Sequence, residues 1–181
     1  MLMADITGWA LRTLQHFYGY DSFRGRQLDV ITAILQHRDV LAVMPTGAGK
    51  SICYQIPACA PGINGKPALV LVITPLRALM RDQVAHLSTH GIPAAFIDSE
   101  TTGTERAMTL RIRLVAVDEA HCVFQWGQDF RPDYLGIAAF IEQLPERPVI
   151  AACTATATPT VREGIIQNLH LLCTGLFKYP V

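Results

Sequence analysis

The sequence predicts an α/β fold in which a mostly parallel sheet carries helices on both faces. Short apolar runs rich in Val, Ile and Leu recur along the chain, and amphipathic stretches with helical spacing separate them. Because the strands of a parallel sheet are buried on both faces, they read as continuous apolar runs. One run leads directly into a glycine-rich turn followed by a lysine, which is typical of a phosphate-binding loop.

The predicted elements follow one another in a regular order along the chain. Helical spacing of apolar residues predicts helices over 7–18, 25–36, 51–56 and 76–89. Continuous apolar runs predict strands over 39–44, 68–74, 94–97, 114–117 and 148–153. A short helix over 104–110 is expected before the fourth strand.

The composition is that of a globular domain. Half of the 181 residues are hydrophobic and 17% are charged, so a substantial core can form. Fifteen Lys and Arg residues balance fifteen Asp and Glu residues. A formal net charge of zero argues against general attraction to nucleic acid, but it leaves room for a local basic groove.

The cysteines and the apolar segments exclude several classes of protein. The five cysteines are widely spaced and form no C-x-x-C pair, so we expect reduced thiols and neither a zinc site nor a disulfide framework. The N-terminus lacks the pattern of a signal peptide, and the apolar runs are too short to span a bilayer. We therefore expect no membrane partner.

The stretch MPTGAGKS, residues 44–51, matches the end of the phosphate-loop pattern, although Met44 occupies the first glycine position. The loop chemistry is preserved if the next four residues make the tight turn, because their backbone N–H groups and the following helix N-terminus can cradle phosphates. Lys50 would neutralise the phosphate oxygens, and the Ser51 hydroxyl would ligate Mg²⁺. The four turn residues are Thr46, Gly47, Ala48 and Gly49.

A pair of acids follows the fourth predicted strand. Asp118 would hold Mg²⁺, and Glu119 would orient or deprotonate an attacking water molecule. Two acids after a strand are often only the start of a polar loop. Their combination with the phosphate loop, and with His121 in the sequence DEAH, favours an ATP-hydrolysing site.

With these motifs in view, the chain resembles the first RecA-like domain of a superfamily two helicase, and more narrowly of the RecQ family. The segments that carry the resemblance are FYGYDSFRGRQ (17–27), MPTGAGKS (44–51), ITPLRALMRDQV (73–84), DEAH (118–121), CVFQWGQDFRPDY (122–134) and TATAT (154–158). They occur in the family order and span most of the chain. The implied cofactors are ATP and Mg²⁺, and the implied location is the bacterial cytoplasm, at the nucleoid, or the nucleus.

The resemblance also implies roles for residues outside the phosphate loop. Tyr20 would stack on adenine, Gln27 would read its hydrogen-bonding edge, and Arg24 would lie near the base or the phosphates. Thr154 and Thr156 would connect the nucleotide site to the DNA side. Ordinary roles at a helix entry or a strand end remain alternatives for these residues.

Single-stranded or duplex DNA is the implied partner. Exposed aromatic rings beside an arginine make a stacking platform for bases, although the same rings could pack inward as core. A basic side chain on the helix after the second strand could contact DNA phosphates or simply face solvent. The candidate DNA-binding residues are Arg77, Phe124, Trp126, Phe130 and Arg131.

Two positions in the aromatic segment differ from the usual family pattern. Phe124 stands where a serine is common, and Gln128 stands where a histidine is common. In the family this histidine is thought to help the loop sense the nucleotide state. Gln128 is therefore a candidate coupling residue that cannot become cationic, although it can still donate and accept hydrogen bonds.

The segment between motifs Ia and II is too short for the family pattern. Asp98–Ile112 provides fifteen residues, which can hold one helix but not a helix, a strand and a second helix. We therefore predict that one strand and its flanking helices are missing between 98 and 112. The predicted divisions are N-terminal helices with the adenine motif (1–38), a RecA-like lobe (39–172), and the start of a link (173–181) to a second lobe that is absent.

The expected function is that of the ATP-binding lobe of a RecQ-like, ATP-dependent 3′-to-5′ DNA helicase. Because such enzymes separate strands by closing two lobes around ATP, we expect no unwinding by this chain alone. Two alternatives are a truncated, non-enzymatic remnant that binds DNA or a partner, and another P-loop ATPase that acts on RNA.

Overall fold

The computed structural model describes residues 3–60, 69–75, 77–96, 112–124, 132–172 and 175–178. Within them, a five-stranded parallel sheet has the order β2-β3-β4-β1-β5. The strands are β1 (Val40–Val43), β2 (Leu69–Ile73), β3 (Ile112–Val117), β4 (Val149–Thr154) and β5 (Gly175–Lys178). The α-helices are α1 (Met3–Tyr18), α2 (Gln27–Leu35), α3 (Lys50–Ala58), α4 (Arg77–Thr89), α5 (Gly136–Glu142) and α6 (Pro159–Asn168).

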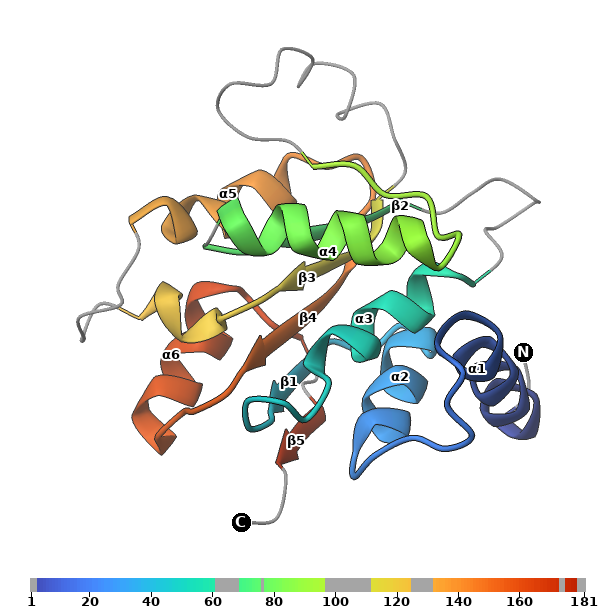
Figure 1. The fold of residues 1–181 in the computed structure, drawn as a ribbon. Coiled ribbons are helices and arrows are strands. Elements are labelled where there is room, and N and C mark those ends of the chain that lie inside the picture. The colour runs from blue at the N-terminus through green and yellow to red at the C-terminus, as the bar shows by residue number, and fades with distance from the viewer. Residues whose placement is uncertain are drawn as a thin grey trace.

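Helices cover both faces of the sheet (Figure 1). On one face, side chains of α2 and α3 such as Val30 and Tyr54 pack against β1, β3 and β4, and α1 packs onto these two helices. On the other face, α5, α6 and the short 3-10 helices η3 (Ala120–Val123) and η4 (Pro132–Leu135) pack against the same strands. The predicted fold class is confirmed.

Two parts of the strand prediction need correction. The strand predicted over 94–97 is wrong for residues 94–96, which form no strand, and Ile97 lies outside the described residues. A β-strand requires a neighbour to hydrogen-bond with, and the described part of the chain pairs β2 only with β3. Conversely, β5 was not predicted, yet it pairs with β1 along its whole length. The helix predicted over 104–110 lies outside the described residues.

The edge position of β2 agrees with the predicted loss of a strand. Its five residues are all apolar, yet each is only partly buried, whereas every residue of β4 is buried. A strand next to β2 would have covered this edge. The described residues therefore carry an apolar edge strand, of the kind that other proteins shield with charge, proline or a covering element.

The buried carboxylate of Asp39 joins the beginnings of three strands. It lies just before β1 and accepts hydrogen bonds from the backbone N–H of Ile150 in β4 (2.9 Å) and from that of Leu172 before β5 (2.7 Å). Arg147 donates to it with both terminal guanidinium nitrogens, Nη2 at 2.6 Å and Nη1 at 3.3 Å. The Asp39 carbonyl also accepts from Gly175 N at the start of β5. One acidic residue therefore sets the register of β1, β4 and β5.

In the described part of the chain, no helix has the length and apolar character required to cross a membrane. Within the same residues, no three His, Cys, Asp or Glu side chains come together as a metal-ion site.

Replacing Asp39 with alanine should destabilise the fold by about 3 kcal/mol, because the buried N–H of Ile150, the part-buried N–H of Leu172 and the Arg147 guanidinium lose their acceptor. The measurement is urea unfolding followed by circular dichroism. Asp29→Ala is the matched control, since Asp29 makes an exposed ion pair with Arg26 at 2.6 Å, and such pairs contribute roughly 0–1 kcal/mol. Equal losses in the two variants would contradict the role assigned to Asp39.

Candidate functional site

The phosphate-loop candidate has the predicted strand–turn–helix arrangement. It lies between the carboxyl end of β1 and the first residue of α3. Gly47 and Gly49 have φ angles of 79° and 76°, in the left-handed region that glycine adopts readily. Thr46 and Gly47 are exposed, and Ala48 is half-buried, so backbone at the tip of the loop faces solvent. This geometry suits the cradling of phosphate by backbone N–H groups.

Met44 behaves as the last core residue of the strand rather than as part of the turn. Its side chain is fully buried, and its N–H donates to Thr154 O at the end of β4 (2.9 Å). Its carbonyl accepts a hydrogen bond from Lys50 Nζ at 3.3 Å. The turn therefore forms without a glycine at position 44, and the ammonium group of Lys50 lies back across the loop.

The acidic pair lies two strands away, at the same edge of the sheet. Asp118 follows β3 and is 7% exposed, and its Oδ1 accepts a hydrogen bond from Glu119 N (3.1 Å). Burial and the neighbouring charge of Glu119 raise the pKa of the Asp118 carboxyl. Glu119 has a φ of 49°, a left-handed conformation that is uncommon outside glycine and is concentrated at functional sites.

His121 joins the acidic turn to the end of β4. Its Nδ1 lies 3.3 Å from Glu119 Oε2 and 2.9 Å from Thr154 Oγ1. The Thr154 hydroxyl in turn donates to Thr156 O at 3.1 Å. Because β4 lies between β1 and β3, the phosphate loop after β1 and the DEAH turn after β3 come together around Thr154 at the end of β4.

The residues assigned to adenine form a second group, on the connection between α1 and α2. Tyr20 is 49% exposed and the Arg24 guanidinium lies 5.8 Å from its ring centre, so the ring is open to stacking. Gln27 is only 2% exposed, and its amide is engaged on both sides. Its Nε2 donates to Ala48 O (2.9 Å) and Gly49 O (3.1 Å), and its Oε1 accepts from Arg24 N. In this structure Gln27 ties the adenine group to the phosphate loop.

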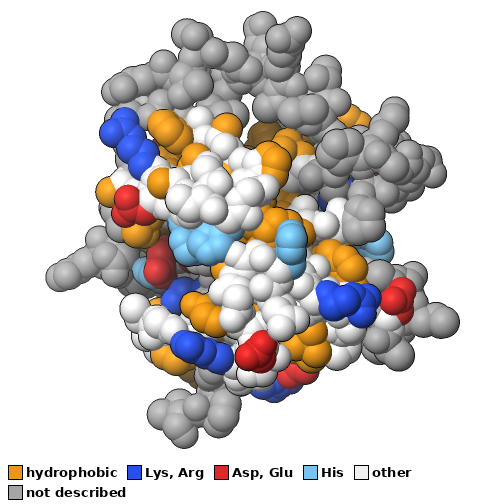
Figure 2. Space-filling model, turned by 45° about the vertical axis from the view of Figure 1, so that its right-hand side comes forward, with side chains coloured by type: hydrophobic (Ala, Val, Ile, Leu, Met, Phe, Trp, Pro, Cys, Tyr) orange, Lys and Arg blue, Asp and Glu red, His pale blue; other side chains and the backbone are white. Residues whose placement is uncertain are grey.

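The residues assigned to DNA are only partly described. Trp126, Gln128, Phe130 and Arg131 lie outside the described residues, as does the side chain of Arg77 at the start of α4. On the face drawn in Figure 2, basic side chains are scattered among acidic and apolar ones and form no continuous patch. A basic groove on that face is not visible in the described part of the chain.

Phe124 packs inward, against α6. A Cβ built on Gly164 would lie 2.1 Å from the Phe124 ring, so the absence of a side chain at 164 makes room for the ring. Asn168 of the same helix donates to Val123 O at 2.8 Å. These contacts hold Phe124, the first ring of the aromatic segment, in place. For this one ring they favour inward packing over stacking on DNA bases.

Several residues at the site were not singled out from the sequence. Tyr134 donates to Asp118 O (3.2 Å) and steadies the acidic turn, and Tyr54 of α3 is fully buried beside Asp118. The sequence could have indicated Tyr54, because it follows Ser51 by three residues on a predicted helix and therefore lies on the same face. Tyr134 is sixteen residues from Asp118, and only the fold joins them.

Comparison with known proteins identifies the family. The sequence family described as DEAD/DEAH box helicase matches residues 24–111 and 91–164, which together cover most of the chain. The chain belongs to the DEAD/DEAH box helicase family. The phosphate loop, the DEAH turn and Thr154 all lie within the matched residues.

The relatives include proteins named as RecQ DNA helicases, which confirms the predicted resemblance. The chain is 40% identical to "ATP-dependent DNA helicase RecQ" of Bacillus subtilis (strain 168), over 87% of its own length and 31% of the relative's. It is 39% identical to the protein of the same name from Haemophilus influenzae, over 94% and 31% of the two lengths. The chain therefore spans about a third of the length of each of these two relatives.

Solved helicase structures share the fold. The structure of "DUF1998 helicase MrfA bound to DNA and AMPPNP" superposes with a TM-score of 0.71 at 17% identity, covering 93% of this chain and 28% of that one. "Mycobacterium smegmatis helicase Lhr bound to ssDNA and AMP-PNP" gives a TM-score of 0.63 at 20% identity, covering 93% and 27%. At these identities the likeness concerns the fold alone.

The helicase relatives carry residues that have no counterpart in this chain. The alignment with the Haemophilus protein runs over 201 residues, whereas the whole chain has 181. The two segments that match the helicase family overlap over residues 91–111, and the missing piece was predicted between 98 and 112. This overlap agrees with a missing internal piece between α4 and β3, and the longer alignment shows only that the relative has extra residues.

Replacing Asp118 with asparagine should stabilise the nucleotide-free chain at pH 7 to 8. A carboxyl whose pKa is raised by folding lowers stability as the pH rises from about 4, its value in the unfolded chain, through its folded value. Asparagine avoids that loss and keeps an oxygen for Glu119 N. The measurement is the urea midpoint between pH 3.5 and 8. Asp82→Asn, on the exposed side of α4, is the control, and a gain that persists at the lowest pH would contradict the explanation.

Replacing Gly164 with alanine should destabilise the chain by about 1–3 kcal/mol, because the new methyl group overlaps the Phe124 ring. The better helix propensity of alanine offsets about 1 kcal/mol of this loss. Gly136→Ala is the matched control, since no atom lies within 4 Å of a Cβ at that position. Thermal unfolding checks both variants. In a Phe124→Ser background the Gly164→Ala cost should disappear, and an unchanged cost would refute the contact.

Proposed function

We propose that this chain is the ATP-binding lobe of a RecQ-like, ATP-dependent DNA helicase with 3′-to-5′ polarity. The observation that carries the proposal is the meeting of the phosphate loop, the DEAH turn and Thr154 at one edge of the sheet, in a chain 40% identical to a RecQ protein. Ligands of open parallel sheets bind outside the carboxyl ends of the strands, which is this edge.

The phosphate loop and the DEAH turn have different roles in binding and hydrolysing ATP. The exposed backbone of 46–49 and the N-terminus of α3 bind phosphate oxygens, and Lys50 neutralises their charge. Ser51 and Asp118 supply the hydroxyl and carboxylate oxygens that suit Mg²⁺, which when bound would neutralise the charge of the β- and γ-phosphates. Glu119 orients the attacking water and accepts its proton, with His121 close enough to steady its carboxylate.

Adenine is held by the group on the α1–α2 connection. The exposed ring of Tyr20 stacks on the base, and Arg24 lies over the same ring. Gln27 reads the edge of the base only if its amide exchanges the carbonyls of Ala48 and Gly49 for the base. Adenine recognition and the shape of the phosphate loop are then linked through one side chain.

DNA is the proposed partner, since the curated relatives are named as DNA helicases and MrfA was solved bound to DNA. Trp126, Phe130 and Arg131 would stack on bases and neutralise the backbone, and Arg77 would contact phosphate. Gln128, Thr154 and Thr156 would couple this surface to ATP. We do not expect strand separation by this lobe alone, since it spans about a third of the length of these two relatives.

A second candidate is a remnant that folds and binds a partner without using ATP. It is favoured by the residues that the Haemophilus relative has and this chain lacks. The two candidates differ in whether Lys50 matters for nucleotide binding.

Replacing Lys50 with alanine should weaken Mg-ATP binding by about 10- to 100-fold, the loss of one charge-assisted contact. The measurement is titration with a fluorescent ATP analogue. Arg38→Ala is the matched control: it also removes one positive charge, but Arg38 lies at the opposite, amino-terminal edge of the sheet, where it donates to Gln36. Equal binding by the wild type and the Lys50 variant would support the remnant instead.

A further inference from the structure

Phe124, the first ring of the aromatic segment, is seated on the backbone of α6. A Cβ built on Gly164 would overlap both Cδ2 and Cε2 of the ring, so one edge of the ring lies directly over that glycine. The side chain is half-buried, and in the described part of the chain it belongs to none of the apolar clusters that form the core. The ring therefore attaches a chain segment to a helix and is not a member of the core.

A hydrogen bond beside Phe124 attaches the same stretch of backbone to the same helix. Asn168, the last residue of α6, donates from Nδ2 to Val123 O at 2.8 Å. Gly164 and Asn168 are four residues apart and so lie on one face of α6. Two consecutive residues are therefore held to that face, Val123 by its carbonyl and Phe124 by its ring.

The backbone at these contacts continues directly from the DEAH turn. Cys122 N donates to Glu119 O at 2.9 Å, at the start of the 3-10 helix η3. Phe124 N donates to His121 O at 3.1 Å and ends that helix. Figure 1 shows η3 beside α6. The chain that leaves Phe124 therefore starts from a point fixed both by the DEAH turn and by α6.

The last residue of the aromatic segment is also attached to the DEAH turn. Tyr134 is 5% exposed, packs in the same apolar cluster as Val123 and donates to Asp118 O at 3.2 Å. The candidate DNA-binding residues that follow Phe124 all lie between these two anchors. A short stretch of chain fixed at both ends has fewer conformations to lose than one fixed at a single end. Binding by such a stretch costs less conformational entropy.

We propose that Phe124 is a positioning residue for single-stranded DNA, because its ring, seated over Gly164, fixes the start of the aromatic segment before DNA binds. The inference rests on the proposed function, since it concerns the DNA-binding residues of that proposal. Phe124 touches no DNA in this role and acts through the chain that follows it. The serine that is common at this position in the RecQ family has no ring to place on α6.

The first experiment measures the affinity of the 181-residue chain for a short fluorescein-labelled oligothymidine by fluorescence anisotropy. Phe124→Ser should weaken binding about three- to tenfold, because the aromatic segment then loses its conformational freedom only when DNA binds. It should leave the affinity for a fluorescent ADP analogue with Mg²⁺ unchanged, which a general loss of structure would not do.

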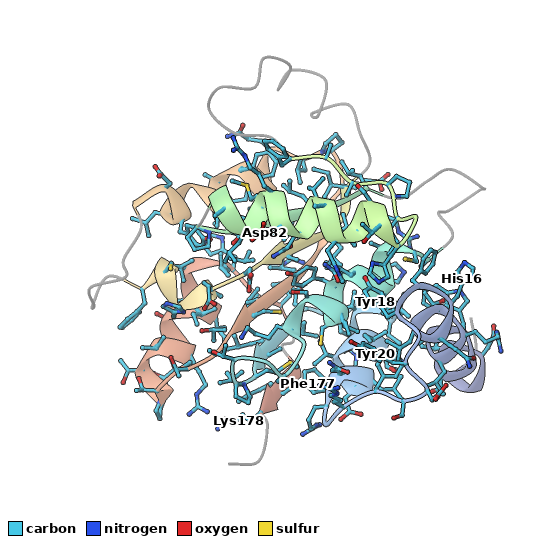
Figure 3. The ribbon with its side chains drawn as sticks, viewed as in Figure 1. His16, Tyr18, Tyr20, Asp82, Phe177 and Lys178 are labelled. Atoms are coloured by element: carbon cyan, nitrogen blue, oxygen red, sulfur yellow. The ribbon has the colours of Figure 1, made fainter. Side chains whose placement is uncertain are left out.

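Phe17→Ser is the matched control for Phe124→Ser. Phe17 is also a half-buried ring outside the apolar clusters, and it packs edge-on against His16 of α1 with ring centres 4.6 Å apart. Figure 3 labels His16 on the side of the molecule that carries α1, away from η3 and α6. Phe17→Ser should therefore bind the oligothymidine as the wild type does.

A change on α6 distinguishes an anchoring ring from a ring that stacks on bases. Gly164→Ala keeps the ring but places a methyl group where its edge lies. Displacing a stacking ring toward solvent would preserve or strengthen DNA binding, whereas losing an anchor weakens it as Phe124→Ser does. The double variant should bind no more weakly than Phe124→Ser alone, because no ring is left to displace. Gly136→Ala, at an open position on α5, should keep the wild-type affinity.

A second measurement follows the aromatic segment without DNA. The chain has two tryptophans, so a Trp9→Phe background leaves Trp126, two residues after Phe124, as the reporter. The anisotropy decay of Trp126 should show more fast local motion in Phe124→Ser and in Gly164→Ala, and wild-type motion in Phe17→Ser. Asn168→Ala removes the second attachment while position 164 stays open, and it takes the place of Gly164→Ala if that variant does not fold.

The outcomes separate this inference from the proposed function. Wild-type DNA affinity or unchanged Trp126 motion in Phe124→Ser would overturn the inference, while Lys50-dependent nucleotide binding would leave the proposed function standing. Stronger DNA binding by Gly164→Ala would also overturn it, since the ring would then contact DNA itself. A wild-type chain that binds no oligothymidine would overturn both this role and the proposed DNA partner. Weaker DNA binding and faster Trp126 motion in both single variants, with no further loss of affinity in the double variant, would establish the anchor.

Discussion

The buried carboxylate of Asp39 is the interaction on which the rest of this domain depends. It binds backbone N–H groups at the starts of β4 and β5 from its place just before β1. In a parallel sheet, the register set at one end decides which residues meet at the other. The pairing of Val43 with Thr154 follows, and with it the hydrogen bond from Met44 N to Thr154 O. A structural carboxylate at the amino-terminal edge thus positions the proposed nucleotide site at the opposite edge.

Polar contacts from three elements surround the phosphate loop. The Gln27 side chain of α2 donates to the loop carbonyls of Ala48 and Gly49. The Thr154 carbonyl at the end of β4 accepts from Met44 N. The Tyr54 hydroxyl joins α3, the helix that follows the loop, to Gln83 of α4.

The sequence alone was enough to predict those elements whose residue pattern lies within one short stretch of the chain. A buried strand, a turn with two glycines and a helix starting at Lys50 all lie within a dozen residues, so their pattern could be recognised and proved correct. The strand expected over 94–97 failed because a strand depends on a neighbour, and the apolar pattern of AAFI says nothing of one. β5 was missed for the converse reason: GLFK is a weak pattern, and its pairing with β1 comes from the fold. The double engagement of Gln27, and the inward packing of Phe124, likewise depend on residues far away in the chain.

The contact between Phe124 and Gly164 constrains the order in which these positions could have changed. Serine is common at 124 in the RecQ family, and it demands no space from α6. A phenylalanine at 124 is compatible with this packing only when position 164 has no Cβ. Positions 124 and 164 are therefore coupled: a side chain at 164 is costly only while an aromatic ring occupies 124. Variation at the start of the aromatic segment is thus linked to a helix that lies forty residues further along the chain.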